Sequence, residues 1–261
     1  MTMIRHELRQ GRISFLIWTI SISFLLVVCI FLFPEMKGEM DGINEMFSSM
    51  GSFTEAFGMD KVSFGTLTGF YAVECGNILG LGGAFFASIC AVSALAKEEK
   101  EHTAEFLFTH PVSRVRLVTQ KLISVLIQVI LLNLIVFLLS AACITLIGEP
   151  IPWEELGLLH LAYFLLQLEL AGICFGISAF LRTGSAGVGL GIAALMYFLN
   201  LIANISDRAE FLKFLTPFGY ADGTQVVTEL CLDGRKVTIG MGVAVVGVLC
   251  GMWEYLRKDI F

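Results

Sequence analysis

Two acidic side chains, Glu74 and Glu169, lie inside long apolar runs of this sequence. Ionisable groups in lipid are costly, and they usually face a cavity or a binding partner. Asn77 follows Glu74 by three residues, so the two side chains share one face of a regular helix. Glu74, Asn77 and Glu169 are candidates to line a translocation path or a dimer seam. A position of Glu74 near the outer end of its span would instead place it in water.

The other residue types that support chemistry do not form a recognisable active site. The seven cysteines contain no C-x-x-C pair, and no metal-binding spacing relates the four histidines, His6, His102, His110 and His160. The sequence also lacks the G-x-x-x-x-G-K-[ST] loop that cradles nucleotide phosphates. We therefore expect this chain to have no catalytic residues and to bind no metal or nucleotide. An intramembrane enzyme would need a converging set of reactive groups, which this pattern does not provide.

Further polar and small residues inside the apolar runs predict helix packing. For the polar residues, we favour hydrogen bonds between helices over contacts with a substrate. These polar residues are Gln128, Asn133, Gln167 and Asn200. Glycines also recur at the four-residue spacing that lets membrane helices approach closely. For these glycines we favour packing within the bundle, and a seam between two chains is the alternative. The glycine pairs are Gly76/Gly80, Gly172/Gly176, Gly187/Gly191 and Gly247/Gly251.

The composition identifies an integral membrane protein. Of 261 residues, 56% are hydrophobic and only 15% are charged, against about 25% charged in a typical soluble domain. A membrane-spanning helix needs about 20 apolar residues. Because backbone groups in lipid must bond within their own segment, we predict an all-α membrane protein. Its six predicted spans are 13–34, 67–96, 120–148, 157–181, 184–204 and 237–255, the first being a retained span rather than a cleaved signal peptide.

Basic residues predict the orientation of these spans. With a cytoplasmic N-terminus, the inner segments hold 11 of the 17 basic residues and the outer loops hold 6. Acidic residues divide the other way, with 7 inside and 14 outside. An excess of basic residues marks the cytoplasmic side, so we expect both termini to be cytoplasmic. The remaining segments are an amphipathic start at 1–12, outer segments at 35–66, 149–156 and 205–236, and a cytosolic insert at 97–119.

The cytosolic insert combines charge with an apolar cluster. Residues 97–108 suit a short helix, which Pro111 ends, and Ser113 can then cap the next helix. The neighbouring Phe106, Leu107 and Phe108 need an apolar surface against them. Either they lie on the membrane as an interfacial helix, or they insert into a groove of a partner protein, with charged neighbours that set the register.

This insert resembles the cytosolic loop of ABC-2-type permeases. The matches in "EHTAEFLFTHPVSRVRLVTQKL" are Glu101, Thr103, Glu105, Leu107, Pro111, Val112, Ser113, Arg114 and Lys121. Phe106 and Phe108 stand where the family usually has leucine, and His102 replaces a common glycine. A second segment, "FLKFLTPFGYADG", resembles the motif that precedes the last span of the family, and its matches are Thr216, Pro217, Phe218 and Tyr220. With the six spans and the amphipathic start, the resemblance covers nearly the whole chain.

The resemblance implies the permease subunit of a bacterial ABC exporter, of the ABC-2 or type V kind. The insert would be a coupling helix docked into an ATPase subunit, through Glu101, Thr103, Glu105, Phe106, Leu107, Phe108, Pro111, Ser113 and Arg114. ATP and magnesium would bind to that partner, and two permease chains, identical or related, would assemble with two ATPase chains. Residues 1–12 would form an elbow helix on the inner surface, and the short helices before the last span, with Pro217, Phe218 and Tyr220, would dip into the bilayer.

The resemblance also implies a location and a class of cargo. The implied location is the bacterial cytoplasmic membrane, with the lipid bilayer as a partner and no nucleic acid. The cargo is expected to be a drug, a peptide or another amphiphile. A stand-alone secondary transporter or channel that uses Glu74 and Glu169 is the alternative, and such a protein would need no partner ATPase.

Overall fold

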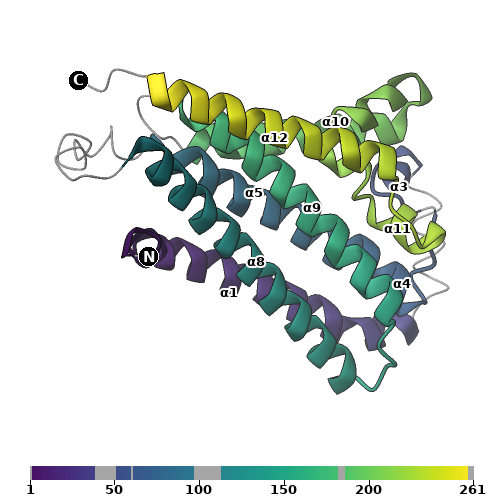
Figure 1. Cartoon of the computed structure of the whole chain (residues 1–261). Helices are drawn as coiled ribbons and strands as arrows, with labels where there is room; N and C mark the ends of the chain where they lie inside the picture. The colour runs from purple at the N-terminus through teal and green to yellow at the C-terminus, as the bar shows by residue number, and fades with distance from the viewer. Residues whose placement is uncertain (1, 39–50, 60, 97–112, 182–185, 258–261) are drawn as a thin grey trace.

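A computed structural model of the chain describes residues 2–38, 51–59, 61–96, 113–181 and 186–257. Every regular element in these ranges is a helix (Figure 1). Six stretches are long and apolar enough to cross a membrane, which confirms the predicted all-α fold with six spans. They are α1 (Thr2–Gly38), α4–η1–α5 (Leu67–Ala94), α8 (Arg114–Leu146), α9 (Trp153–Ser178), α10 (Ala186–Ile205) and α12 (Gly234–Arg257).

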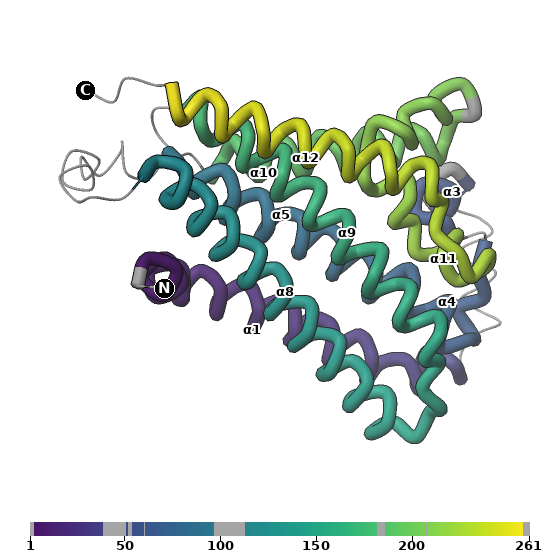
Figure 2. The backbone as a smooth tube through the Cα atoms, viewed as in Figure 1, coloured from purple at the N-terminus to yellow at the C-terminus, as the bar shows by residue number. Residues whose placement is uncertain are grey.

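The spans differ from the predicted bounds mainly at their starts. Helix α1 is continuous from Thr2, so it joins the predicted elbow at 1–12 to the first span. Figure 2 shows its first turns nearly end-on while the rest runs across the view, so the helix changes direction near its start. Helix α8 begins at Arg114, six residues before the predicted start, because the Ser113 side chain caps it there. The predicted number of six spans is therefore correct, although the helices extend beyond the apolar runs.

The second span contains an irregularity that hydropathy does not predict. Helix α4 (Leu67–Phe70) leads into the π-helix η1 (Tyr71–Cys75), and α5 (Gly76–Ala94) follows without a break. Thr66 caps the start, since its hydroxyl accepts a hydrogen bond from the Gly69 N–H at 3.2 Å. A π-turn rotates the residues that follow it relative to an ideal helix, and such turns recur at functional sites. Glu74 lies within this turn.

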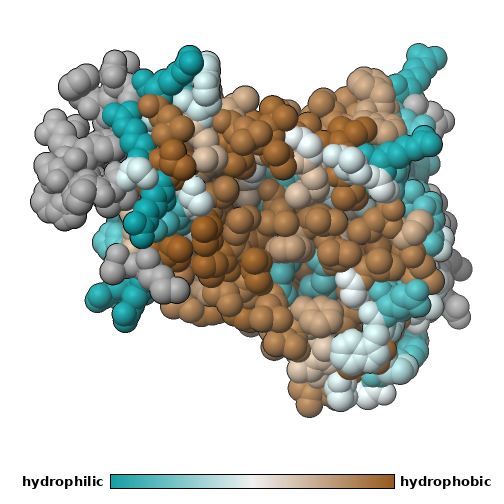
Figure 3. Space-filling model, in the orientation of Figure 1, coloured by the Kyte–Doolittle hydropathy of each residue, from teal (hydrophilic) through white to brown (hydrophobic). Residues whose placement is uncertain are grey.

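Helices α5 and α9 form the centre of the bundle. Helix α9 packs against both α5 and α12, while α10 packs on α5 and α1 on α8. Within the most apolar stretch of each span, 67% of the residues are buried in α9 and 61% in the α4–η1–α5 span. In α1, α10 and α12 the buried share is only 17–22%. The peripheral helices therefore present large apolar faces outward, and Figure 3 shows them as an apolar band between two polar ends.

The two ends of the bundle carry different structures. One end, called here the N-terminal end, contains the starts of α1 and α8 and the end of α12 (Figure 1). The opposite end, called the distal end, carries the short helices (Figure 1). Besides α4, they are α3 (Ser52–Ala56), η2 (Asp207–Phe214), η3 (Pro217–Gly219) and α11 (Gly223–Glu229). The last three occupy the predicted segment at 205–236.

Glycines allow the central helices to approach one another. A Cβ on Gly176 of α9 would collide with the backbone of Gly247 in α12, and one on Gly251 would collide with Gly176. Gly172 meets the backbone and Cβ of Ala244 in the same way. The Gly76/Gly80 pair packs against the Tyr163 ring of α9. Packing within the bundle is thus confirmed for three of the four glycine pairs; Gly191 of the fourth has nothing within 4 Å.

Candidate functional site

Most of the predicted coupling segment lies outside the described residues. This applies to Glu101, Thr103, Glu105, Phe106, Leu107, Phe108 and Pro111, whereas Ser113 and Arg114 are described. The Ser113 hydroxyl accepts a hydrogen bond from the Arg116 N–H at 3.4 Å, as the predicted cap requires. The Arg114 guanidinium donates to the Leu256 carbonyl near the end of α12, also at 3.4 Å. The segment therefore enters the bundle where α8 and α12 meet.

A buried ion pair attaches the start of α1 to this end of α8. The Lys121 ammonium lies 3.1 Å from the Glu7 carboxylate, and the Lys121 side chain is only 1% exposed. One turn further, a Cβ on Gly11 would press on the Gln128 side chain, so α1 and α8 are in close contact there. Since buried charges need a partner, the pair fixes the first turns of α1 against α8. The sequence pattern identifies Lys121 only as a match to the cytosolic loop of the family and gives no sign of its pairing with Glu7.

Glu169 lies in the core of the bundle. It is 4% exposed, and its carboxylate accepts a hydrogen bond from the Tyr220 hydroxyl at 2.9 Å. Helix α12 reaches the carboxylate through Gly240, where a Cβ would collide with it. Glu169 thus joins α9, α12 and the segment between η3 and α11 at one point.

Glu74 and Asn77 do not line the same space. Asn77 lies in the wall of a cavity of about 40 Å³, whereas Glu74 is half-buried and lies near Cys29 of α1. The Asn77 amide donates to the Val73 carbonyl at 2.8 Å and accepts from the Tyr197 hydroxyl at 3.2 Å. Glu74 lies within the π-turn at Tyr71–Cys75, whereas Asn77 lies in the first turn of α5.

The cavity beside Asn77 is polar and small. Its wall also contains Tyr163, Tyr197, Asn200, Asn204 and Asp222, from α9, α10 and the distal segment. Among the described residues, the side-chain oxygens of Asn200 and Asn204 are buried without a hydrogen-bond partner. Such groups are usually satisfied by water, and the volume accommodates a few water molecules. A solute of drug or peptide size would not fit this space.

The distal motif anchors its segment to the bundle. Pro217 and Phe218 are buried, and the Phe218 ring packs edge-on against Tyr197, with centroids 5.3 Å apart. The Thr216 hydroxyl caps η3 and donates to the Met196 carbonyl of α10 at 2.8 Å. Together with the Tyr220–Glu169 bond, these contacts fix the segment to α9 and α10.

Two polar networks hold the central helices together. The Asn133 amide donates to the Gln167 side-chain oxygen at 2.7 Å, which confirms the predicted interhelical bond. The Tyr71 hydroxyl lies 2.8 Å from Ser140 Oγ and 2.9 Å from His160 Nε2, all three side chains being buried. The sequence pattern does not indicate this second network, because a single Tyr, Ser or His in an apolar span changes its hydropathy little. Within the described ranges, no cluster of His, Cys, Asp and Glu could hold a metal ion.

The Tyr220–Glu169 bond gives a direct test of how the distal segment is held. We expect Tyr220→Phe to lower the free energy of unfolding by about 1–2 kcal/mol, because it removes a hydrogen bond to a buried carboxyl group. Thermal unfolding of Tyr220→Phe, Glu169→Gln and the double variant in detergent measures the coupling between the two side chains. Effects that simply add, within about 0.3 kcal/mol, would show that the bond contributes nothing.

Comparisons with known proteins agree with this architecture. The sequence matches a family described as "ABC-2 family transporter protein" over residues 1–260. It is also 26% identical over 215 residues to the uncharacterized protein YhcI of Bacillus subtilis (strain 168), an alignment that covers 73% of this chain and 68% of that protein.

Proposed function

Because this chain belongs to the ABC-2 transporter family, we propose that it is the membrane-spanning permease subunit of an ATP-binding cassette transporter. The observation that carries this proposal is the family match over residues 1–260, together with the six membrane-spanning helices. The sequence has no phosphate loop, so ATP hydrolysis takes place on a separate ATPase chain, which binds ATP and magnesium. The chain itself moves solute and has no catalytic role.

The insert at 97–119 transmits force from the ATPase to the bundle. The residues that dock are the cluster Phe106, Leu107 and Phe108 with its charged neighbours. Contacts at its C-terminal edge support this role, because Arg114 contacts the end of α12, and Lys121 pairs with Glu7 of α1. A movement of the insert would therefore reach three spans at once.

The N-terminal end of the bundle is the cytoplasmic end, and the membrane is the bacterial cytoplasmic membrane. The excess of basic residues among the segments at that end supports this orientation. The first turns of α1 lie on the inner surface as an elbow. The distal helices η2, η3 and α11 are then extracytoplasmic, with Pro217 and Phe218 packed into the outer half of the bundle.

The pathway forms between two permease chains, identical or related, and the direction is export. The small size of the cavity inside one chain supports a pathway at a seam between chains. A drug, peptide or other amphiphile is the cargo. A secondary transporter driven through Glu74 and Glu169 is less well supported, because Glu169 is engaged by Tyr220 and Gly240 and Glu74 lies away from the cavity that Asn77 lines.

The test is purification of the full, tagged chain from its own host, followed by reconstitution into liposomes. We expect a protein with a phosphate loop to co-purify in about equal amount, since each permease chain would bind one ATPase chain. Transport by the reconstituted complex should require hydrolysable ATP. A chain that purifies alone and moves solute without nucleotide would overturn the proposal in favour of a secondary transporter.

A further inference from the structure

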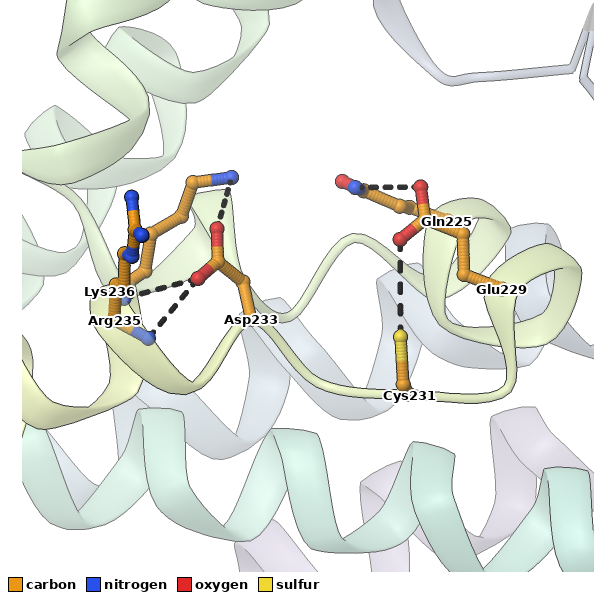
Figure 4. Close-up of polar contacts among 6 residues, drawn as sticks. All are labelled: Gln225, Glu229, Cys231, Asp233, Arg235 and Lys236. Atoms are coloured by element: carbon orange, nitrogen blue, oxygen red, sulfur yellow. Dashed lines mark hydrogen bonds and ion pairs between the residues drawn. The ribbon is translucent and has the colours of Figure 1, made fainter.

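A charged pocket of about 290 Å³ lies at the distal end, and we call it the distal pocket. Four separate segments supply its wall, which consists of Lys61, Glu210, Lys213, Gln225, Thr228, Glu229 and Lys236. Figure 4 shows Lys236 and Gln225 pointing toward each other across an open gap. Within the part of the chain that the structure describes, none of these residues belongs to the apolar core.

The wall of the pocket offers charges of both signs. Lys236 pairs with Asp233 at 3.3 Å, and Glu229 accepts a hydrogen bond from the Gln225 amide at 3.0 Å (Figure 4). Lys61, Lys213 and Glu210 form no ion pair within the part of the chain that the structure describes. The pocket therefore leaves two ammonium groups and one carboxylate available to a ligand.

Asp233 maintains the position of the third ammonium group. Partial burial raises the pKa of the Asp233 carboxyl, but hydrogen bonds from Lys236 and from the Arg235 backbone, with the charge of Lys236, hold this pKa below its usual range. The carboxylate thus stays charged at neutral pH and keeps the Lys236 ammonium at the rim of the pocket.

Exposed apolar side chains are neighbours of the wall residues Glu210, Lys213 and Lys236. Phe211, Phe214 and Leu215 are between 51% and 68% exposed, and the Lys236 ammonium lies 5.6 Å from the centre of the Phe214 ring. Below Lys236, α12 exposes an apolar face that consists of Ile239, Val243 and Val246. The pocket thus combines charged groups with neighbouring apolar side chains, a combination that suits the headgroup region of a lipid bilayer.

The segment that carries Lys213 is fixed in place. The Lys213 carbonyl occupies the position that a Cβ on Gly219 would take, so η2 is packed directly on η3. The segment that carries Gln225 and Glu229 is α11. Asp222 caps this helix by accepting hydrogen bonds from the N–H groups of Thr224 and Gln225. The charged groups thus project from a preorganised frame, which lowers the cost of ordering them on binding.

We propose that the distal pocket binds the headgroup of a zwitterionic phospholipid that carries a primary ammonium, such as phosphatidylethanolamine. Lys61, Lys213 and Lys236 contact the phosphate, while Glu210 and Glu229 accept hydrogen bonds from the ammonium. The acyl chains lie on Phe211, Phe214 and the exposed face of α12. A quaternary choline group cannot donate these hydrogen bonds. A lipid with only negative charge would leave the two glutamates facing like charge.

Native mass spectrometry of the full chain in detergent tests this proposal with lipids of identical acyl chains. We expect phosphatidylethanolamine to bind about tenfold more tightly than phosphatidylcholine or phosphatidylglycerol, since a favourable difference of about 1.4 kcal/mol corresponds to tenfold. Lys213→Gln and Glu210→Gln should each reduce the preference for phosphatidylethanolamine at least about threefold. Arg235→Gln, an exposed cation next to Lys236 that does not line the pocket, is the matched control and should change nothing.

Three outcomes would overturn the proposal. Phosphatidylglycerol that binds as tightly as phosphatidylethanolamine would show a site for negative charge alone. An effect of Arg235→Gln equal to that of Lys213→Gln would show attraction by the whole distal surface. Soluble glycerophosphoethanolamine that competes at the concentration of the lipid would show that the neighbouring apolar side chains contribute nothing and that the ligand is not a membrane lipid. Melting temperatures without added lipid confirm that each variant is folded.

Discussion

Replacing Gly176 with leucine is expected to lower the free energy of unfolding by about 3 kcal/mol or more, at the upper end of what overpacking a close-packed core costs. Gly176 of α9 meets the backbone of Gly247 and Gly251 of α12, with no flexible side chain between the two helices that could yield. A leucine would therefore have to separate the helix axes. In thermal unfolding of the purified chain in detergent, we expect an apparent melting temperature about 6–12 °C below that of the natural sequence.

Gly242→Leu is the matched control for this experiment. Gly242 lies on α12, the same helix that Gly176 contacts, but it is exposed and has nothing within 4 Å of its position. The added side chain would enter lipid, so we expect stability within about 0.5 kcal/mol of the natural sequence. Equal losses from the two substitutions would mean that a leucine in place of glycine is destabilising in either helix and that the α9–α12 contact has no special weight.

Features that repeat along the chain could be predicted from the sequence. The spans follow from runs of about 20 apolar residues. The role of Ser113 as the cap of α8 follows from the preference for a hydroxyl side chain at the start of a helix. The glycine pairs at 172/176 and 247/251 also follow, because close helix contacts in membranes favour small residues every four positions. Each of these signals is local, so a single sequence contains it completely.

Features that depend on the meeting of distant residues could not be predicted. Glu169 and Tyr220 are 51 positions apart, and neither residue type indicates the other. Glu7 and Lys121 are 114 positions apart, and a count of charges by segment does not pair one charge with another. Hydropathy also gives no sign of the π-turn at Tyr71–Cys75, which contains Glu74, and only Asn77 of the predicted pair lines the cavity. Long-range packing thus decides which polar residue lines a cavity and which joins helices.

Replacing Phe106 or Phe108 with aspartate is expected to abolish association with the ATPase while the chain still inserts into the membrane. Under the proposed function, these rings enter an apolar cleft of the partner, and an unpaired carboxylate there would lose the apolar contact and carry a large desolvation cost. For residues at the centre of an interface we expect affinity to fall at least about a hundredfold, or about 2.7 kcal/mol. Co-purification of the ATPase with the tagged chain measures the loss, and transport should disappear with it.

Two further substitutions separate the apolar contact from a general effect of charge. Phe106→Leu should retain binding, because leucine keeps an apolar side chain at a position where similar permeases usually carry it. Thr109→Asp adds the same charge one residue after Phe108 in a side chain that is already polar, so its effect should stay below about threefold. If the aromatic cluster instead lies on the membrane surface, Phe106→Asp would weaken that contact and leave the ATPase bound at the natural level. That result would remove residues 106–108 from the coupling mechanism, and the force that drives transport would have to enter the bundle elsewhere.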